Sequence, residues 1–167
     1  MLTQIMNGRI LTPQGWLEDG SVLISDGKIL EVTNSDLAVI GAKVVDAKGM
    51  YIVPGFVAMN LHGGAGHDFT ECTEEAFRSI VSVHQQHGAT TIIPTLSAST
   101  AETILKGAAL CEQLMAEPDS PVLGLHIEGP YLNPKMAGQL YTDTIKPVDR
   151  DEYLSILKQT SCIKRWD

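Results

Sequence analysis

The stretch Val-Leu-Gly-Leu-His-Ile-Glu-Gly-Pro at residues 122–130 decides how this chain folds. Side chains in a β-strand alternate between its two faces. One face of this stretch is apolar and suits packing against helices, and it carries Leu123, Leu125 and Ile127. The opposite face becomes polar toward its C-terminal end, and it carries Val122, Gly124, His126 and Glu128. We therefore predict a strand over residues 122–127 that ends in a glycine–proline turn.

The stretch Phe-Val-Ala-Met-Asn-Leu-His at residues 56–62 follows the same alternation. Asn60 and His62 fall on one face with Ala58, and the other face, which is apolar and suits packing against helices, carries Val57, Met59 and Leu61. Between the two stretches, apolar residues at helical spacing predict a helix between Thr73 and Gly88. A strand over 90–96 and a helix that begins at the capping box of residues 99–102 follow it. A third helix is expected after Asp149.

Strands that alternate with helices predict parallel βα units, and three such units can be counted after residue 53. Ligand sites in parallel sheets lie at the C-terminal ends of the strands. A closed (β/α)₈ barrel takes about 250 residues, so these units form either a small open sheet or a piece of something longer. Residues 162–167 resemble the approach to a fourth strand that the chain does not contain.

Residues 1–53 have a different pattern, with short β-prone runs and tight turns. Asp26-Gly27 lies between two such runs and predicts a hairpin. We therefore divide the chain into a small β-sandwich-like domain at 1–53 and an α/β domain at 54–167.

Composition excludes several functional classes. Of the 167 residues 44% are hydrophobic, 19% are charged, and the formal net charge is −8. The sequence has no clustered basic face, so we expect no nucleic-acid partner. It has no apolar run that could span a bilayer and no secretory leader, so we expect no membrane partner and a cytoplasmic location. Cys72, Cys111 and Cys162 are odd in number and widely spaced, which favours free thiols.

The polar strand ends predict the site. A carboxylate with imidazoles nearby suits a divalent cation, since Zn²⁺ and Fe²⁺ accept nitrogen and oxygen donors. The alternatives are a salt bridge for Glu128 and ordinary hydrogen-bonded interior side chains for the imidazoles and Asn60. Gly63 and Gly64 follow His62 and would let backbone approach a ligand, or form a plain loop. The remaining histidines suit structural roles, as does Asp68. These histidines are His67, His84 and His87.

Two motifs carry a resemblance to a known family. Residues 46–64, from Asp-Ala-Lys-Gly to Asn-Leu-His-Gly-Gly, look like the opening of the amidohydrolase superfamily. The stretch at 126–134, His-Ile-Glu-Gly-Pro-Tyr-Leu-Asn-Pro, resembles the N-acetylglucosamine-6-phosphate deacetylase family. The resemblance runs along the whole chain and covers about the N-terminal two-fifths of that family's length. It implies that residues 54–167 are the first three units of a (β/α)₈ TIM-type barrel.

The resemblance also implies an activity. The family hydrolyses the N-acetyl amide of N-acetylglucosamine-6-phosphate to glucosamine-6-phosphate and acetate, with a divalent metal as Lewis acid. By this resemblance Glu128 is a metal ligand, His62 a weaker one and Asn60 a poor one, with one firmly held Zn²⁺ or Fe²⁺. The positions that lie near the substrate are Gly63, Gly64, Gly138 and Gln139. The partner is an amino-sugar phosphate, and a homodimer or other homo-oligomer is expected.

The chain also departs from the family pattern. Ala58 stands where the family has an aspartate, and the family's later histidine ligands and catalytic aspartate match positions beyond Asp167. We therefore expect these residues alone to be inactive. The open alternatives are another amidohydrolase, such as a cyclic-amide hydrolase or an adenine deaminase, and a non-catalytic assembly module that reuses the fold. Asn60 in place of a histidine disfavours the first of these.

Overall fold

A computed structural model describes residues 1–34, 39–138 and 142–167. The chain divides into two compact units, Met1–Pro54 and Gly55–Asp167, which are described separately. None of the helices in the described part of the chain is long and apolar enough to cross a lipid bilayer.

The first unit is a mixed sheet of five strands within the described residues. The strands are β1 (Leu2–Thr12), β2 (Gly15–Ser25), β3 (Lys28–Thr33), β4 (Lys43–Asp46) and β5 (Tyr51–Ile52). They run in the order β3-β2-β1-β4, and β5 also pairs with β1. The predicted hairpin is confirmed: β2 and β3 pair antiparallel, and Asp26 and Gly27 have φ of 49° and 76°. This turn needs a positive φ at both central positions, which explains the Asp-Gly pair.

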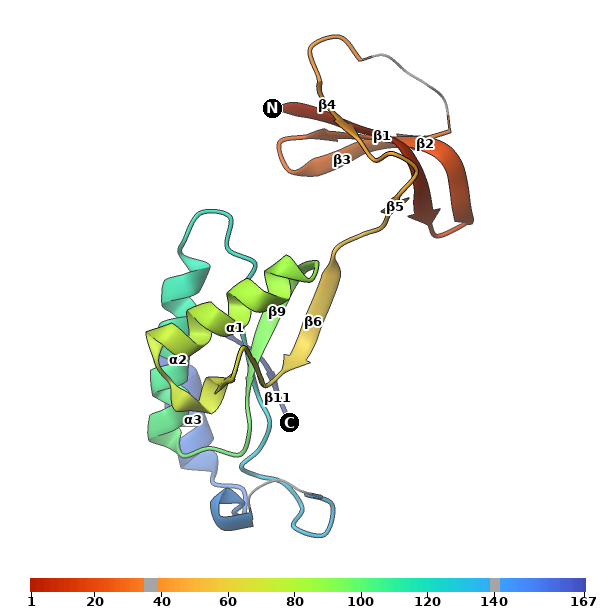
Figure 1. Ribbon diagram of the computed structural model, residues 1–167. Coiled ribbons are helices and arrows are strands. Elements are labelled where there is room, and N and C mark those ends of the chain that lie inside the picture. Colours follow the sequence, from red (N-terminus) through yellow and green to blue (C-terminus); the bar gives the residue numbers. More distant parts are fainter. Residues whose placement is uncertain (35–38, 139–141) are drawn as a thin grey trace. The chain divides into compact units, whose positions relative to one another are not determined.

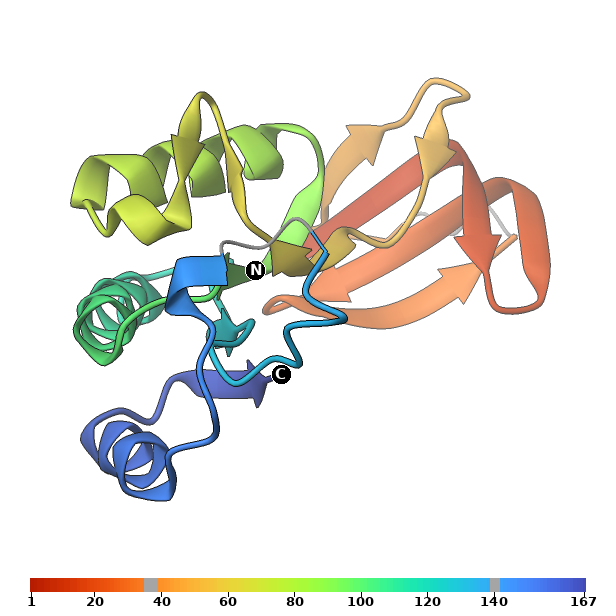
Figure 2. The same ribbon diagram turned by 90° about the horizontal axis from the view of Figure 1, so that it is seen from below.

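The second unit is a layer of helices on a parallel sheet. Its strands are β6 (Phe56–Leu61), β7 (Gly63–Gly64), β8 (His67–Asp68), β9 (Ala89–Leu96), β10 (Leu125–Ile127) and β11 (Ile163–Trp166). Its helices are η1 (Phe69–Glu71), α1 (Glu74–Gln86), α2 (Ala101–Met115), η2 (Thr142–Thr144) and α3 (Arg150–Gln159). The main sheet has the order β11-β10-β9-β6 with parallel pairing. The three α-helices lie along the same side of this sheet (Figures 1 and 2).

The core of this unit lies between the sheet and the helices. Helix α1 contributes Phe77 and Ile80, which are fully buried, and α2 contributes Ile104. Leu125 and Ile127 face this core, as the alternation of the third predicted strand requires. The alternating βα units and the β-rich first unit are those of the predicted fold class.

The structure corrects several details of the predicted elements. A fourth strand is present, because residues 163–166 form β11 beside β10. Strand β10 begins only at Leu125, and Val122 makes an isolated bridge with Ile92 outside it. Leu123, which was predicted to pack against helices, is exposed. Helix α2 is capped by Thr100, whose side chain accepts from the Thr103 amide. Ser99 instead donates to the Ser97 carbonyl, so the N-cap lies one residue after the predicted one and Thr100 makes only the single capping bond.

The first strand of this unit also differs from the prediction. Val57 and Met59 were predicted to face helices, but both are more than half exposed. Leu61 contacts the core as predicted, and Ala58, which was predicted on the opposite face with Asn60, contacts it as well. The register of β6 against β9 is irregular between Ala58 and Leu61, which breaks the strict alternation.

Candidate active site at the strand ends

His62 and Glu128 meet at the C-terminal end of the parallel sheet. His62 follows β6 and Glu128 follows β10, with β9 between the two strands. Because the strands run parallel, their C-terminal ends lie at the same edge, and the two side chains converge across β9. The His62 Nε2 atom lies 3.2 Å from the Glu128 Oε2 atom. The structure therefore brings together the two residues that the sequence ranked first as metal ligands.

Ser97 completes this cluster from the end of β9. Its Oγ atom lies 3.0 Å from His62 Nδ1. The Ser97 hydroxyl can donate to or accept from Nδ1, so the direction of this hydrogen bond follows the tautomer of His62. The exposed fractions of the His62 and Glu128 side chains are 37% and 25%, so a ligand can reach both.

His126 does not join this cluster, although the sequence placed it on the same face as Glu128. Its side chain is fully buried. Its Nδ1 atom lies 3.1 Å from Thr95 Oγ1, and its Nε2 atom lies 3.2 Å from Asp167 Oδ2. Arg165 donates two hydrogen bonds to the same Asp167 carboxylate, at 2.8 and 2.7 Å. His126 thus belongs to a second polar layer, two residues earlier along the strands.

The turn after Glu128 is held from β11. Gly129 has a φ of 86°, which favours glycine, and its carbonyl accepts a 2.7 Å hydrogen bond from the Trp166 indole. The Tyr131 ring stacks on Trp166 with 5.9 Å between the ring centroids. These contacts fix the chain on the C-terminal side of the Glu128 carboxylate.

The glycines after His62 lie close to their neighbours. Gly63 and Gly64 form β7, which pairs with β8. A side chain at Gly63 would collide with the His67 carbonyl, and the Cβ of one at Gly64 would lie 2.9 Å from His84 Nε2. His84 also contacts the Gly63 carbonyl at 3.1 Å. Packing thus explains both glycines, beside the substrate contact that the resemblance implies.

The other predicted site residues lie outside this cluster. Asn60 is exposed on β6 and makes no hydrogen bond to His62 or Glu128. Gly138 is exposed in a left-handed conformation with a φ of 60°. Gln139 lies outside the described residues. The three cysteines are buried and free, as predicted.

Sequence reasoning missed Ser97, Thr95 and Asp167. Thr95 and Ser97 are spaced two apart at the end of a predicted strand, which is the signal that singled out His126 and Glu128. The same alternation in the strand predicted at residues 90–96 could therefore have identified Thr95 and Ser97. Asp167 could not be assigned, because the pairing of β11 with β10 depends on contacts distant in sequence.

The atoms that His62 and Glu128 offer are of the type that binds a divalent cation, but two ligands are too few for a complete metal site. An imidazole nitrogen and a carboxylate oxygen are ordinary Zn²⁺ or Fe²⁺ ligands, and a catalytic zinc site has three protein ligands. Among residues 1–34, 39–138 and 142–167, no group of three or more His, Cys, Asp or Glu side chains could hold a metal ion. His62 and Glu128 can therefore supply part of a metal site, and further donors are needed to complete it.

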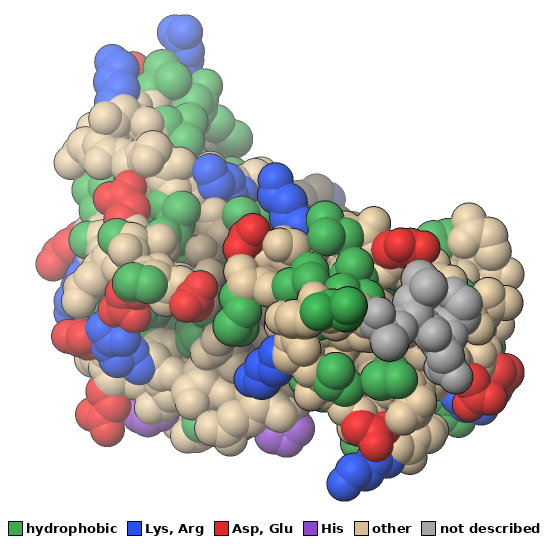
Figure 3. All heavy atoms as spheres, turned by 90° about the horizontal axis from the view of Figure 1, so that it is seen from above, with side chains coloured by type: hydrophobic (Ala, Val, Ile, Leu, Met, Phe, Trp, Pro, Cys, Tyr) green, Lys and Arg blue, Asp and Glu red, His purple; other side chains and the backbone are tan. Residues whose placement is uncertain are grey.

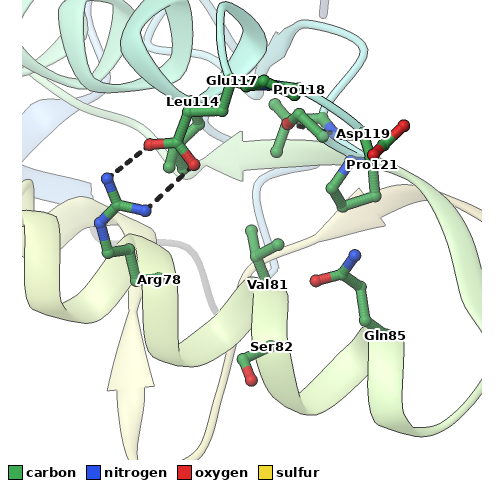
Figure 4. Close-up of a pocket in the computed structure, with 11 residues that line it drawn as sticks. Arg78, Val81, Ser82, Gln85, Leu114, Glu117, Pro118, Asp119 and Pro121 are labelled. Atoms are coloured by element: carbon green, nitrogen blue, oxygen red, sulfur yellow. Dashed lines mark hydrogen bonds and ion pairs between the residues drawn. The ribbon is translucent and has the colours of Figure 1, made fainter.

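A cavity of about 330 Å³ lies away from this cluster, between α1 and the loop that precedes β10. Figure 4 shows the Arg78 guanidinium facing the Glu117 carboxylate across it, with contacts of 2.5 and 3.2 Å. Arg78 also forms an ion pair with Glu74, so the charge of its guanidinium is balanced by the carboxylates of Glu74 and Glu117. The cavity lies where strands begin, whereas the His62–Glu128 cluster lies where strands end, and only the cluster has the chemistry of a site.

The face of the molecule seen in Figure 3 carries no cluster of Lys and Arg side chains. Lys and Arg side chains are scattered among acidic ones on this face. This distribution provides no basic patch on the face in view for a nucleic-acid backbone.

Comparison with known proteins agrees with the resemblance seen in the sequence. No protein-family profile matches the chain. The human protein named N-acetylglucosamine-6-phosphate deacetylase is 26% identical over 160 residues, which cover 92% of this chain and 37% of that protein. A protein of Escherichia coli O157:H7 named N-acetylgalactosamine-6-phosphate deacetylase is 28% identical over 142 residues, which cover 82% and 36%. The chain thus spans little more than a third of the length of these relatives.

A solved structure supports the same conclusion. The N-acetyl-D-glucosamine-6-phosphate deacetylase of Mycobacterium smegmatis superposes with a TM-score of 0.83 and 25% identity, covering 98% of this chain and 46% of that one. Sequence and fold therefore agree that this chain is similar, over nearly its whole length, to the N-terminal portion of N-acetylglucosamine-6-phosphate deacetylases.

Proposed function

We propose that this chain supplies part of the active site of a metal-dependent deacetylase that acts on an amino-sugar phosphate. The reaction is hydrolysis of the N-acetyl amide of N-acetylglucosamine-6-phosphate to glucosamine-6-phosphate and acetate. The observation that carries the proposal is the 3.2 Å approach of His62 to Glu128 at the C-terminal ends of two parallel strands. The names of the relatives support the reaction and the substrate class.

Glu128 and His62 are the residues of this chain that would hold the metal, with Asn60 as a weaker contributor. A bound Zn²⁺ or Fe²⁺ supplies Lewis acidity toward the amide carbonyl and the attacking water. To bind the metal through the Nε2 lone pair, a neutral His62 ring must carry its proton on Nδ1. The Nδ1–H group then donates a hydrogen bond to Ser97 Oγ. The hydroxyl can donate or accept, so Ser97 orients the ring in both states.

The remaining parts of the site are proposed to come from the rest of a longer polypeptide. These parts are two further metal ligands and the carboxylate that acts as general base and acid. Gly63 and Gly64 lie next to His62 and are proposed to face the acetyl group, and Gly138 and Gln139 to face the sugar. We also propose a cytoplasmic location and a homo-oligomeric assembly.

A second sugar is a specific alternative. The relative named N-acetylgalactosamine-6-phosphate deacetylase is 28% identical to this chain, against 26% for the human relative named for the glucosamine derivative. The two sugars differ only in the configuration of one hydroxyl, and no described side chain of the His62–Glu128 cluster distinguishes them. Both sugar phosphates therefore belong in the assay.

The test measures acetate release by a polypeptide that carries this chain as its N-terminal part. We expect turnover of an N-acetyl amino-sugar phosphate and none of a hydantoin or of adenine. Glu128→Gln should lower kcat by about a hundredfold or more, because even the partners that orient metal ligands are worth 10- to 100-fold. Glu117→Gln is the matched control, since that carboxylate binds Arg78 away from the strand ends. Equal activity of the two variants would refute the role of Glu128.

A further inference from the structure

A chain of hydrogen bonds crosses all four strands of the main sheet, one layer before the His62–Glu128 cluster. The Leu61 amide of β6 donates to Thr95 Oγ1 of β9 at 3.0 Å. The same Oγ1 atom lies 3.1 Å from His126 Nδ1 of β10. The His126 Nε2 atom lies 3.2 Å from the carboxylate of Asp167, which directly follows β11. We call these four residues, Leu61, Thr95, His126 and Asp167, the cross-strand relay.

The chemistry of the groups gives the relay one direction. The Asp167 carboxylate only accepts, so His126 carries a proton on Nε2, and in the neutral ring its Nδ1 is an acceptor. Thr95 then donates its hydroxyl proton to Nδ1 at 3.1 Å, which is closer than its other acceptor, the Ile93 carbonyl at 3.5 Å, while an oxygen lone pair accepts from the Leu61 amide. Each hydrogen-bond donor has an acceptor in this arrangement. This matters at His126, which is fully buried, because an unpaired ring nitrogen there would destabilise the folded chain.

The relay ends directly at the two candidate ligands. Leu61 precedes His62, so the bond to Thr95 holds the end of β6 against β9. On the other side, the Asp167 amide donates to the Ile127 carbonyl at 2.9 Å, and the Asp167 carbonyl accepts from the Gly129 amide at 3.1 Å. Asp167 thus holds the backbone on both sides of Glu128, while its side chain binds His126.

We propose that His126 is a positioning residue that, through Thr95 and Asp167, sets the spacing between His62 and Glu128. The relay itself is inferred from the geometry, and its purpose in placing metal ligands rests on the proposed function. A buried histidine with a single hydrogen bond would contribute packing to the interior but would not connect two strands. His126 instead joins β9 to β11, and the bonded atoms are next in sequence to the ligands or bracket them.

The first experiment determines the state of the His126 ring in the 167-residue chain. Two-bond correlations between ring nitrogens and carbon-bound protons by NMR report which nitrogen carries the proton. We expect a proton on Nε2, which faces the Asp167 carboxylate at 3.2 Å. A ring without a proton on Nε2 would overturn the hydrogen bond to Asp167 on which the relay depends.

The second experiment uses a matched pair of variants at Thr95. Thr95→Val removes the hydroxyl and keeps the shape, whereas Thr95→Ser keeps the hydroxyl. We expect Thr95→Val to shift the His62 ring resonances and to weaken Zn²⁺ binding, with Zn²⁺ alone as the probe, by 10- to 100-fold. Thr95→Ser should restore both toward the wild-type values, and His126→Phe should behave like Thr95→Val.

A control separates positioning from simple loss of stability. Ile104→Val shortens a core side chain of α2 away from the relay and lowers the melting temperature without touching a relay atom. It should leave the His62 resonances and the Zn²⁺ affinity unchanged. Wild-type resonances and affinity in both Thr95→Val and His126→Phe would overturn the proposal. Zn²⁺ binding is measured on the longer polypeptide of the proposed function, because the 167-residue chain supplies only part of the metal site. No Zn²⁺ binding there would refute that metal site, and the His62 resonances of the Thr95 pair would still decide the relay.

Discussion

At the scale of single residues, close backbone approaches decide which side chains are tolerated. Gly124 is buried just before β10, beside the turn that leads into β11. A Cβ atom there would lie 2.6 Å from the Cys162 carbonyl oxygen and would also meet the Lys164 side chain. Gly107 in α2 is also crowded, but its nearest neighbour is the tip of the flexible Leu96 side chain, at 2.7 Å.

These two glycines give the first stability prediction. Gly124→Ala should lower the free energy of unfolding by about 1–3 kcal/mol, because the Cys162 backbone must move. Gly107→Ala should cost less, since Leu96 can change rotamer and alanine favours a helix interior over glycine by about 1 kcal/mol. Urea unfolding of both variants checks the order. A larger loss for Gly107→Ala would contradict it.

At the scale of elements, one carboxylate ties two segments together. Glu112 of α2 accepts hydrogen bonds from Thr160 Oγ1 at 2.6 Å and from the Ser161 amide at 3.1 Å. These residues form the connection between α3 and β11. The hydrogen bonds from Thr160 and Ser161 lower the pKa of the Glu112 carboxyl below its ordinary value. The ionised form is therefore the one that holds the connection.

Glu112→Gln should lower the free energy of unfolding on the order of 1 kcal/mol near neutral pH. A depressed pKa in the folded state means that the stabilisation is present above the unfolded pKa of about 4.3 and is lost as the pH falls through the folded value. The difference between wild type and variant should therefore shrink below about pH 4. Urea unfolding at several pH values measures it, with Gln113→Glu on the exposed side of α2 as a control. A difference independent of pH would contradict the role of the charge.

At the scale of the whole molecule, the main sheet ends in an apolar edge. Strand β6 lies at one end of the order β11-β10-β9-β6 within residues 39–138 and 142–167. Phe56, Val57 and Met59 on this strand are exposed by 64%, 58% and 56%. An edge strand with unpaired backbone groups and apolar side chains favours association.

We therefore expect the purified 167-residue chain to self-associate as its concentration rises. Replacing Val57 and Met59 together with lysine should keep the chain monomeric, because charge on an edge strand opposes pairing. Light scattering coupled to size-exclusion chromatography measures the mass. Leu157→Lys, an exposed apolar position on α3, is the control and should leave association unchanged. A wild-type chain that stays monomeric at all concentrations would contradict the prediction.

Local patterns in the sequence were enough to determine much of the fold. The hairpin at Asp26-Gly27, the caps at Thr73 and Asp149 and the order of strands and helices all follow from neighbours in sequence. The polar ends of the strands carrying His62 and Glu128 could be found in the same way. Turn chemistry and helix capping act over a few residues, so they can be derived without knowing the tertiary structure.

Only the tertiary structure decided which polar groups meet. Both Glu128 and His126 lie on a polar strand face, yet Glu128 reaches His62 at the rim, and His126 is buried between Thr95 and Asp167. The exposure of Val57 and the pairing of β11 were likewise not predictable. These features depend on the register between strands that are 30 or more residues apart, and a shift of one residue moves every side chain to the opposite face.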